Sequence, residues 1–440
     1  MQVANLKRVQ FDGLLLNIIK FLTLLIICML IVLGTYYSVF SVIACIIVAV
    51  VIIALRFQYS LAILFFLLPF ASLIKITPNS QSLFTYLCLF CVMWNIIKSR
   101  SFDKNFFGAF LIFCLYLLLG AFNNLNLSRL IKFLSNIFII YYALKLKDEN
   151  NYYRIFLFFI LGMIASSLLA VLDVIPNLTE YIAEIDLWRP NNSLERFTGL
   201  YPDPNYYSVN LIISLCLIAI LYHNKKINGL SAAIMSLFIL WFIILTYSKS
   251  AFLMLALPIL LWLYLLIKRK KYISLLIAVI ALIAVVISSL KGNISIFDVV
   301  LSRLDSADSL SSLTTGRFDL WIEYLAYIFE HGGIALFGAG FGADLPYSHA
   351  AHNTYIDFLY YLGIFGTALF IVIILIVGCN KALKVKHCFL NYSIWICIGV
   401  MYFFLSELFF VDLPFHLILA ILVYRINFSS KCEKSISVCC

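Results

Sequence analysis

Three basic residues stand in polar stretches between apolar segments, where a cationic side chain is unusual. Lys249 lies between Ser248 and Ser250, Arg317 opens a stretch with helical spacing, and Arg196 follows Glu195. A guanidinium binds phosphate through paired, charge-assisted hydrogen bonds. A cation at a helix N-terminus is electrostatically unfavourable, so we expect an anion beside Arg317. Together these residues indicate a site for a phosphate-bearing ligand. The simpler alternatives are a solvated turn for Lys249 and a salt bridge with Glu195 for Arg196.

Two histidines, His349 and His352, stand three residues apart just before a long apolar segment. An imidazole near neutral pH can accept a proton from an attacking hydroxyl. On a regular helix, Gly363 and Gly366 would share a face with His352, and glycines allow a second helix or a lipid chain to approach closely. The simpler alternative is a helix-capping His352 with packing glycines. Two histidines without a clear third ligand make a poor zinc site, so neither a metal nor another cofactor is expected.

The composition shows what kind of protein must position these residues. The chain has 440 residues, of which 64% are hydrophobic and 12% charged, against about 45–50% and about 25% in soluble globular proteins. This excludes a soluble enzyme, a disordered scaffold and a nucleic-acid binder. We therefore predict an all-α integral membrane protein, a polytopic bundle of about 12–14 transmembrane helices.

Apolar runs define the candidate spans and their orientation. We expect spans near residues 14–34, 37–55, 58–74, 82–97, 106–122, 130–144, 153–174, 205–222, 228–247, 251–267, 272–290, 353–378, 389–406 and 413–427. If both termini are cytoplasmic, most of the 31 Lys and Arg residues fall on the cytoplasmic side, as the positive-inside rule requires. None of the 12 cysteines falls in a long outer loop. The candidate site residues then lie on the outer face.

Two long outer segments, residues 175–204 and 291–352, hold most of the polar residues expected on the outer side. The longer one contains an apolar stripe at helical spacing that predicts an amphipathic helix over residues 317–329, lying on the outer leaflet. Arg129 and Lys132 begin another span and are weaker basic candidates. We divide the chain into N-terminal helices (1–190), a core with the outer loop (191–378), and C-terminal helices with a cytoplasmic tail (379–440).

These residues resemble the signature of the O-antigen ligase and polymerase superfamily. His352-Asn353 followed by Gly363 and Gly366 reproduces the motif His-Asn-x9-Gly-x2-Gly. Four other elements occur in the order found in that family. They are Arg196-x2-Gly199-x3-Asp203-Pro204-Asn205, Ser248-Lys249-Ser250, Gly316-Arg317-x3-Trp321, and the Gly338-x-Gly340 turn. The resemblance covers roughly residues 190–370 in detail.

The resemblance implies a metal-independent, inverting glycosyltransferase of the GT-C class in the bacterial inner membrane. Such enzymes use a glycan linked to undecaprenyl diphosphate at the periplasmic face. It implies that His352 is catalytic, and that Arg317, Lys249 and Arg196 bind the diphosphate. Asn353, Gly363, Gly366, Asp203, Asn205 and His349 are supporting residues, with Asp203 and Pro204 expected to cap a helix. The partners are lipid-linked donor and acceptor and membrane lipid, without nucleic acid.

Two enzymes and one transporter fit this pattern. Ligases of the family usually carry arginine where this chain has Lys249, which favours a polymerase of O-antigen or capsule repeats over a ligase to lipid A core. A lipid-linked oligosaccharide flippase is a third alternative, but a transporter is expected to show repeated halves. The sequence leaves open the sugar, the oligomeric state and any chain-length-regulating partner.

Overall fold

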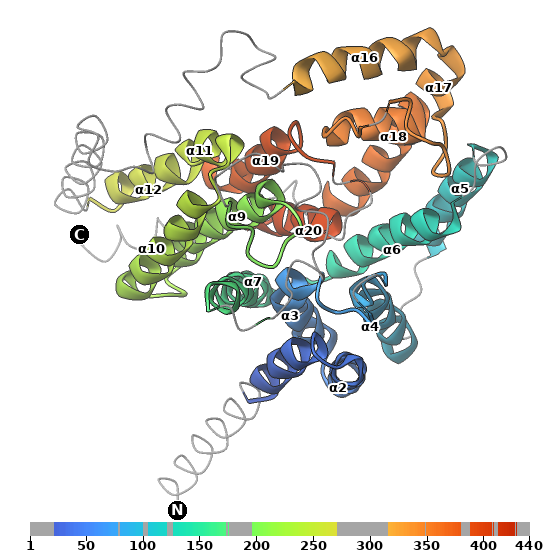
Figure 1. The fold of residues 1–440 in the computed structure, drawn as a ribbon. Helices are drawn as coiled ribbons and strands as arrows, with labels where there is room; N and C mark the ends of the chain where they lie inside the picture. The colour runs from blue at the N-terminus through green and yellow to red at the C-terminus, as the bar shows by residue number, and fades with distance from the viewer. Residues whose placement is uncertain are drawn as a thin grey trace, which may run out of the picture.

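The computed structural model describes residues 22–77, 80–99, 104–120, 126–172, 175, 196–270, 316–347, 349–379, 388–406, 408, 412–426 and 428. Regular structure in these residues is helical throughout (Figure 1). A helix over Leu22–Gly34 comes first. The others are α2 (Ser38–Ala54), α3 (Phe57–Leu67), the 3-10 turn η1 (Leu68–Phe70), α4 (Phe84–Ser99), α5 (Lys104–Gly120), α6 (Leu127–Ala143), α7 (Glu149–Val171), α9 (Pro204–His223), α10 (Gly229–Leu245), α11 (Lys249–Met254), α12 (Ala256–Lys268), α16 (Arg317–Glu330), α17 (Gly332–Phe337), α18 (Thr354–Cys379), α19 (Phe389–Met401) and α20 (Asp412–Tyr424).

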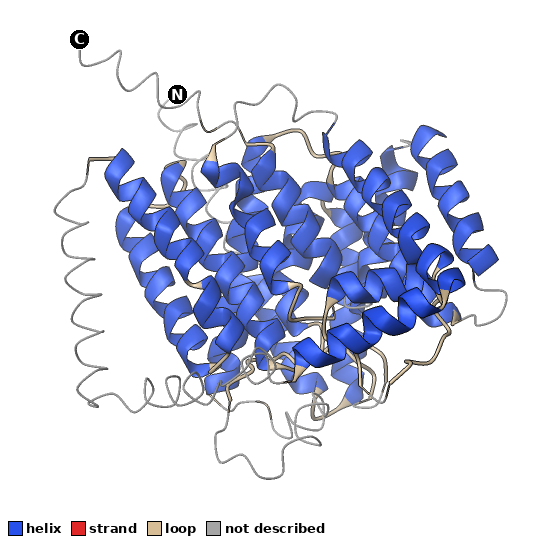
Figure 2. Cartoon of the chain, turned by 90° about the horizontal axis from the view of Figure 1, so that it is seen from above, coloured by secondary structure: helices blue, strands red, loops and turns tan. Residues whose placement is uncertain are grey.

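Every predicted span contains a described helix except 272–290, which lies outside the described residues. Four segments are long and apolar enough to cross a membrane: Glu149–Val171, Pro204–His223, Lys249–Lys268 and Thr354–Ile374. The other apolar helices have 10–17 residues and run beside them (Figure 2). The predicted all-α membrane fold is therefore confirmed.

The helix α9 forms the centre of the bundle, packed against α7, α10, α11, α12 and α19 (Figure 1). All its side chains except that of His223 are buried. Outer helices instead expose large apolar side chains, such as Ile234, Leu237 and Trp241 on α10. Lipid is as apolar as these side chains, so exposing them to it costs little. The surrounding helices thus shield α9 from lipid.

The two ends of α9 define two sides of the bundle, each joined by hydrogen bonds between helix ends. We call the side at Pro204 the α9-start side and the side at His223 the α9-finish side. On the α9-start side, Arg196 Nε donates to Thr246 O at the end of α10 (2.9 Å), and Thr354 N donates to Tyr402 O just after α19 (2.9 Å). On the α9-finish side, Arg269 Nη2 donates to Tyr222 O (2.8 Å), and Arg425 Nη1 donates to Leu144 O (2.6 Å). The candidate site residues that the structure describes all belong to elements on the α9-start side.

Basic residues are distributed unequally between these sides. The α9-finish side carries Arg56, Lys98, Lys145, Arg154, Lys226, Arg269 and Arg425. Fewer described basic residues lie on the α9-start side: Lys75, Arg129, Lys132, Arg196, Lys249 and Arg317. On the α9-start side, Arg196, Lys249 and Arg317 belong to the candidate site.

Candidate active site

The backbone at His352 is held in an unusual conformation directly before α18. Its φ of +48° lies in the left-handed region, which costs a non-glycine residue about 1–3 kcal/mol and persists only where the surrounding structure enforces it. The next residue, Asn353, is buried, and its Oδ1 accepts the N–H groups of Tyr355 (3.0 Å) and Ile356 (3.2 Å). Asn353 thus caps α18 and fixes the chain on the carboxyl side of His352.

The amphipathic helix α16 fixes the chain on the amino side of His352. Trp321 Nε1 donates to Ala351 O (2.9 Å), and the Tyr324 hydroxyl donates to His349 O (2.6 Å). These two residues share a helical face with buried Ile328. The predicted helix is therefore confirmed, but Phe329, an apolar residue at the end of the predicted range, is exposed. The position eight residues after Trp321 lies about 80° off its face at 100° per residue.

The His352 imidazole reaches solvent, yet the surrounding protein removes much of its hydration. The pKa of this imidazole is lowered to about 4; desolvation is the largest cause, the positive charge of Arg317 also lowers the pKa, Asp203 raises it and His349 lowers it. The ring is therefore neutral at pH 7 and able to accept a proton. Charges from α16 and from the start of α9 thus act on the same imidazole.

Arg317 opens α16 after Gly316, which has φ of +80°. Its Nη1 donates to Phe404 O (2.7 Å), in the segment that follows α19. This carbonyl is one compensating group for a cation at a helix N-terminus. It also directs Arg317 toward the segment to which Thr354 binds.

A second group of site residues surrounds the start of α9. Asp203 Oδ1 accepts the N–H of Asn205 (2.6 Å), with Pro204 as first helical residue, so the predicted cap is confirmed. Asn205 Oδ1 in turn accepts the Ser248 hydroxyl (2.7 Å) and Arg196 Nη2 (3.2 Å).

The same contacts position Lys249. Ser248 caps α11, because its Oγ accepts the N–H of Ala251 (3.3 Å), and Lys249 is therefore the first residue of that helix. The half-buried side chains of Arg196 and Lys249 thus belong to elements joined through Asn205. Glu195, the predicted salt-bridge partner of Arg196, lies outside the described residues.

The expected helical face joining His352 to the two glycines is wrong. Gly363 has φ of 65° and ψ of −177°, so α18 is interrupted there, and His352 precedes the helix. A Cβ at Gly363 would collide with the backbone of Leu336 and Gly338, and one at Gly366 would collide with the Tyr116 ring. Protein, rather than a lipid chain, occupies the space beside both glycines.

The interruption frees backbone carbonyls in α18, and neighbouring groups satisfy them. Ala339 N donates to Tyr360 O (2.7 Å), Gly340 N donates to Tyr361 O (3.3 Å), and the Tyr116 hydroxyl donates to Leu362 O (2.7 Å). Such compensation is what allows a helix to break at membrane depth. The predicted glycine turn at Gly338 to Gly340 therefore supplies N–H donors for carbonyls that the break in α18 leaves without a helical partner.

Replacing Gly363 by alanine is expected to destabilise the protein. Alanine disfavours the positive φ of this position, and its Cβ would collide with the backbone of Leu336 and Gly338. We expect a thermal midpoint several degrees lower in detergent, measured by fluorescence-detected size exclusion. Gly108→Ala in α5 is the matched control, since nothing lies within 4 Å of its Cβ position. Equal midpoints for the two variants would contradict this account of the break.

Several site contacts carry no sequence signal. Arg317 and Thr354 bind backbone carbonyls of Phe404 and Leu405, and any residue type supplies a carbonyl. Arg129, one of the weaker candidates, donates to Phe341 O (3.1 Å) beside the glycine turn. In the described chain, no three His, Cys, Asp or Glu side chains gather as a metal site.

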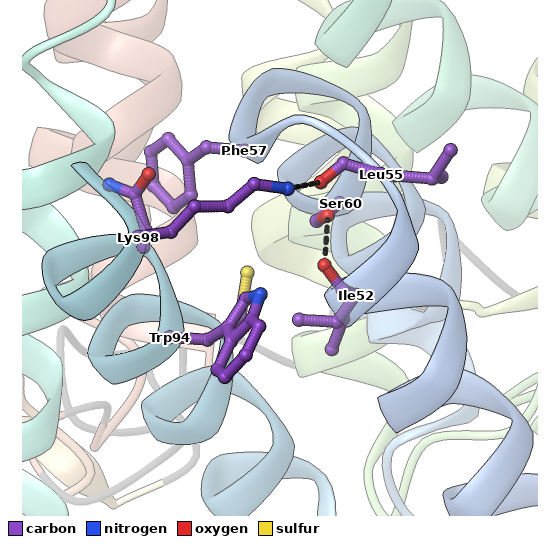
Figure 3. A pocket seen from close by; sticks show the side chains of 8 residues that line it. Ile52, Leu55, Phe57, Ser60, Trp94 and Lys98 are labelled. Carbon is purple, nitrogen blue, oxygen red and sulfur yellow. Dashed lines mark hydrogen bonds between the residues drawn. The ribbon is translucent and has the colours of Figure 1, made fainter.

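A pocket elsewhere in the bundle contains none of the predicted site residues (Figure 3). It lies among α2, α3 and α4 on the α9-finish side, where Lys98 Nζ approaches Leu55 O (3.5 Å). Its lining residues are Ile52, Leu55, Phe57, Ser60, Cys91, Trp94, Asn95 and Lys98. A lysine beside the last carbonyls of a helix is favourable, so Lys98 has a capping role there.

Comparison with known proteins gives one family match. Residues 233–371 match the family model described as O-antigen ligase. Searches of curated proteins and of solved structures gave no match. The matched stretch includes Lys249, Arg317, His352, Gly363 and Gly366. Residues 233–371 are therefore similar to the O-antigen ligase family, which supports the superfamily that the motifs predict.

Proposed function

We propose that this protein polymerises oligosaccharide repeat units linked to undecaprenyl diphosphate, by inverting glycosyl transfer of the GT-C type. The observation that carries the proposal is the position of His352 before α18, where its imidazole lies within reach of the charges of both Arg317 and Asp203. The family match to an enzyme class of membrane ligases and polymerases supports it. Arg196 and Lys249 add positive charge around the nearby start of α9.

The proposed chemistry assigns one task to each group. His352 accepts the proton of the acceptor hydroxyl while that oxygen bonds to the anomeric carbon from the face opposite the leaving group. The bond from this carbon to the diphosphate oxygen breaks, and the diphosphate leaves with the electron pair. Arg317, Lys249 and Arg196 stabilise its negative charge, as preorganised cations do for developing charge.

The distribution of basic residues supports the sidedness of this proposal. Arg56, Lys98, Arg154, Lys226 and Arg425 lie on the side opposite His352. Loops rich in Lys and Arg stay in the cytoplasm. We therefore assign the α9-finish side and both termini to the cytoplasm, and the site to the periplasmic face of a bacterial inner membrane.

The choice between polymerase and ligase depends on Lys249. Arginine is usual at this position in ligases, and lysine keeps the charge but loses the planar fork. The description of the matching family as O-antigen ligase favours the alternative, transfer of the finished glycan to lipid A core. The two enzymes act at different steps, so a deletion strain separates them.

Deleting the gene from a lipopolysaccharide producer is expected to leave core carrying a single repeat unit, with the longer ladder absent on the gel. A polymerase is then missing while the ligase of the cell still works. Complementation with the wild-type gene should restore the ladder. Bare core, with polymer accumulating on the undecaprenyl carrier, would identify the protein as the ligase instead. In a strain that makes only capsule, the readout becomes polymer length.

A further inference from the structure

A chain of hydrogen bonds runs through the buried interior between α9, α19 and α20. The Tyr402 hydroxyl lies 3.2 Å from His416 Nδ1, and His416 Nε2 lies 3.0 Å from Asn210 Oδ1. Asn210 Nδ2 donates to Asp412 Oδ1 (3.3 Å), which also accepts the Tyr201 hydroxyl (3.4 Å). All five residues are buried, and Asn210 and His416 are completely inaccessible. We call Tyr402, His416, Asn210 and Asp412 the interior chain.

The donors and acceptors of the interior chain have one consistent assignment. Asn210 Nδ2 donates both to Asp412 Oδ1 and to Tyr206 O (3.0 Å), so its amide orientation is fixed. Asn210 Oδ1 must then accept the proton of His416 Nε2, which leaves His416 Nδ1 to accept the Tyr402 hydroxyl in a neutral ring. Every donor therefore points toward Asp412, and hydrogen bonds aligned in this way strengthen one another.

Two residues of the interior chain, Tyr402 and Asp412, lie just after α19 and at the start of α20. Tyr402 is the first residue of the stretch Tyr402–Ser406, and Asp412 begins the next helix. Four contacts join this stretch to the site and to α9. Thr354 N donates to Tyr402 O (2.9 Å), Thr354 Oγ1 to Leu405 O (2.6 Å), Arg317 Nη1 to Phe404 O (2.7 Å), and the Tyr206 hydroxyl to Ser406 O (2.8 Å).

The elements of the candidate site thus share one backbone support. Thr354 stands two residues after His352, and Tyr206 stands three residues after Asp203. Moving Tyr402–Ser406 would therefore move Arg317 and the start of α18 relative to the start of α9. The interior chain links Tyr402, the first residue of this support, to Asn210 of α9, and the Tyr206 hydroxyl links its last residue, Ser406, to the same helix.

We propose that Asn210, His416 and Asp412 are positioning residues that fix the geometry of Arg317, His352 and Asp203 for glycosyl transfer, an inference that rests on the proposed function. Hydrogen bonds between membrane helices contribute little to stability on average, so stability alone does not require such a chain. Ionisable residues inside a bundle are instead characteristic of functional regions. A misplacement of about 1 Å in an active site can lower the rate about 10²-fold.

The chain offers a matched control in Asn391. This buried asparagine also bridges α19 and α20, with Nδ2 donating to Tyr424 O (3.0 Å) and Ile426 O (2.8 Å), but on the α9-finish side. The test compares His416→Phe and Asn210→Leu with Asn391→Leu in the full-length protein. His416→Gln, which can keep both a donor and an acceptor, is the conservative variant, and Tyr402→Phe removes one hydroxyl only.

We expect His416→Phe and Asn210→Leu to lower kcat about 10²-fold per folded molecule, with little change in donor KM, and His416→Gln to recover part of it. Hydrogen–deuterium exchange should rise at Tyr402–Ser406 and Thr354 in both variants. In Asn391→Leu it should rise only on the α9-finish side, with kcat unchanged. If His416→Phe and Asn210→Leu fail to fold, kcat and exchange are compared between Tyr402→Phe and the wild type instead, with the same expected directions.

Two outcomes would overturn the positioning role. One is a total activity that falls only in proportion to the amount of folded protein, so that kcat per folded molecule stays unchanged, as expected for Asn391→Leu. The other is unchanged exchange at Tyr402–Ser406, which counts against the proposal whether or not transfer is detected. An absence of transfer by wild-type protein with purified lipid diphosphate donor would instead remove the proposed function. Exchange and turnover thus separate the two failures.

Discussion

Replacing His352 by alanine is expected to abolish detectable glycan transfer while leaving folding and membrane insertion intact. General base assistance contributes about 10²–10⁴-fold to rate, and the neutral His352 ring is the proposed base. The measurement is the initial rate with a purified lipid diphosphate donor, at matched amounts of folded protein. His331→Ala is the control, since His331 is exposed at the end of α16 and its Nδ1 faces its own helix at Tyr327 O (2.8 Å).

The pH profile distinguishes proton transfer from positioning. A base must be neutral to act, so kcat/KM falls as pH drops through the pKa of the free enzyme. The pKa of His352 is lowered to about 4, mainly by desolvation, so the acid limb should lie near pH 4, below the usual histidine range. A His352→Gln variant with substantial activity and no acid limb would assign positioning instead. Normal turnover in His352→Ala would remove the residue from the site.

Replacing Arg317 by alanine is expected to raise the donor KM about 10–100-fold, the range for a lost charged hydrogen bond of about 1.5–3 kcal/mol. Arg317→Lys should lose less, since it keeps the charge but cannot reproduce the fork. Lys249→Arg should be tolerated, because it restores the residue usual in the family's ligases. Donor dependence of the initial rate measures all three. Lys226→Ala is the control, a cation bound to Asn150 on the opposite side.

The Arg317 variants also carry a second readout. The positive charge of Arg317 lowers the pKa of His352, so its removal should move the acid limb of kcat/KM to higher pH. Burial is the larger cause, so the shift should be partial. An unchanged donor KM together with an unchanged acid limb would show that Arg317 acts on neither the ligand nor His352.

Sequence patterns predicted the membrane helices well because long apolar runs are sufficient to identify them. The cap at Asp203 and the amphipathic helix over Arg317–Glu330 followed from residue type and spacing. The interruption at Gly363 did not, because it depends on the close approach of Leu336–Gly338, which no local pattern encodes. The ideal-helix projection placed His352 and Gly363 on one face for that reason.

The rest of the site depends on long-range contacts between common groups. Phe404 O and Leu405 O bind Arg317 and Thr354 as backbone carbonyls, independent of residue type. Asn210 and His416 lie more than 200 positions apart in the chain, so their contact is invisible in either helix alone. Sequence reasoning thus found the residues with distinctive chemistry and missed the groups that hold them.

The burial of α9 has a consequence for biogenesis. Inside the finished bundle, its asparagines and serines are satisfied, including Asn210 and Ser214. A nascent chain that ends before α20 presents Asn210 without Asp412 and His416, which are its later partners. Polar side chains facing hydrocarbon are unfavourable, so α9 is expected to dwell at the insertion machinery until the last helices arrive. Truncation after α12 should therefore yield a chain that membrane proteases clear rapidly, although every span it contains is complete.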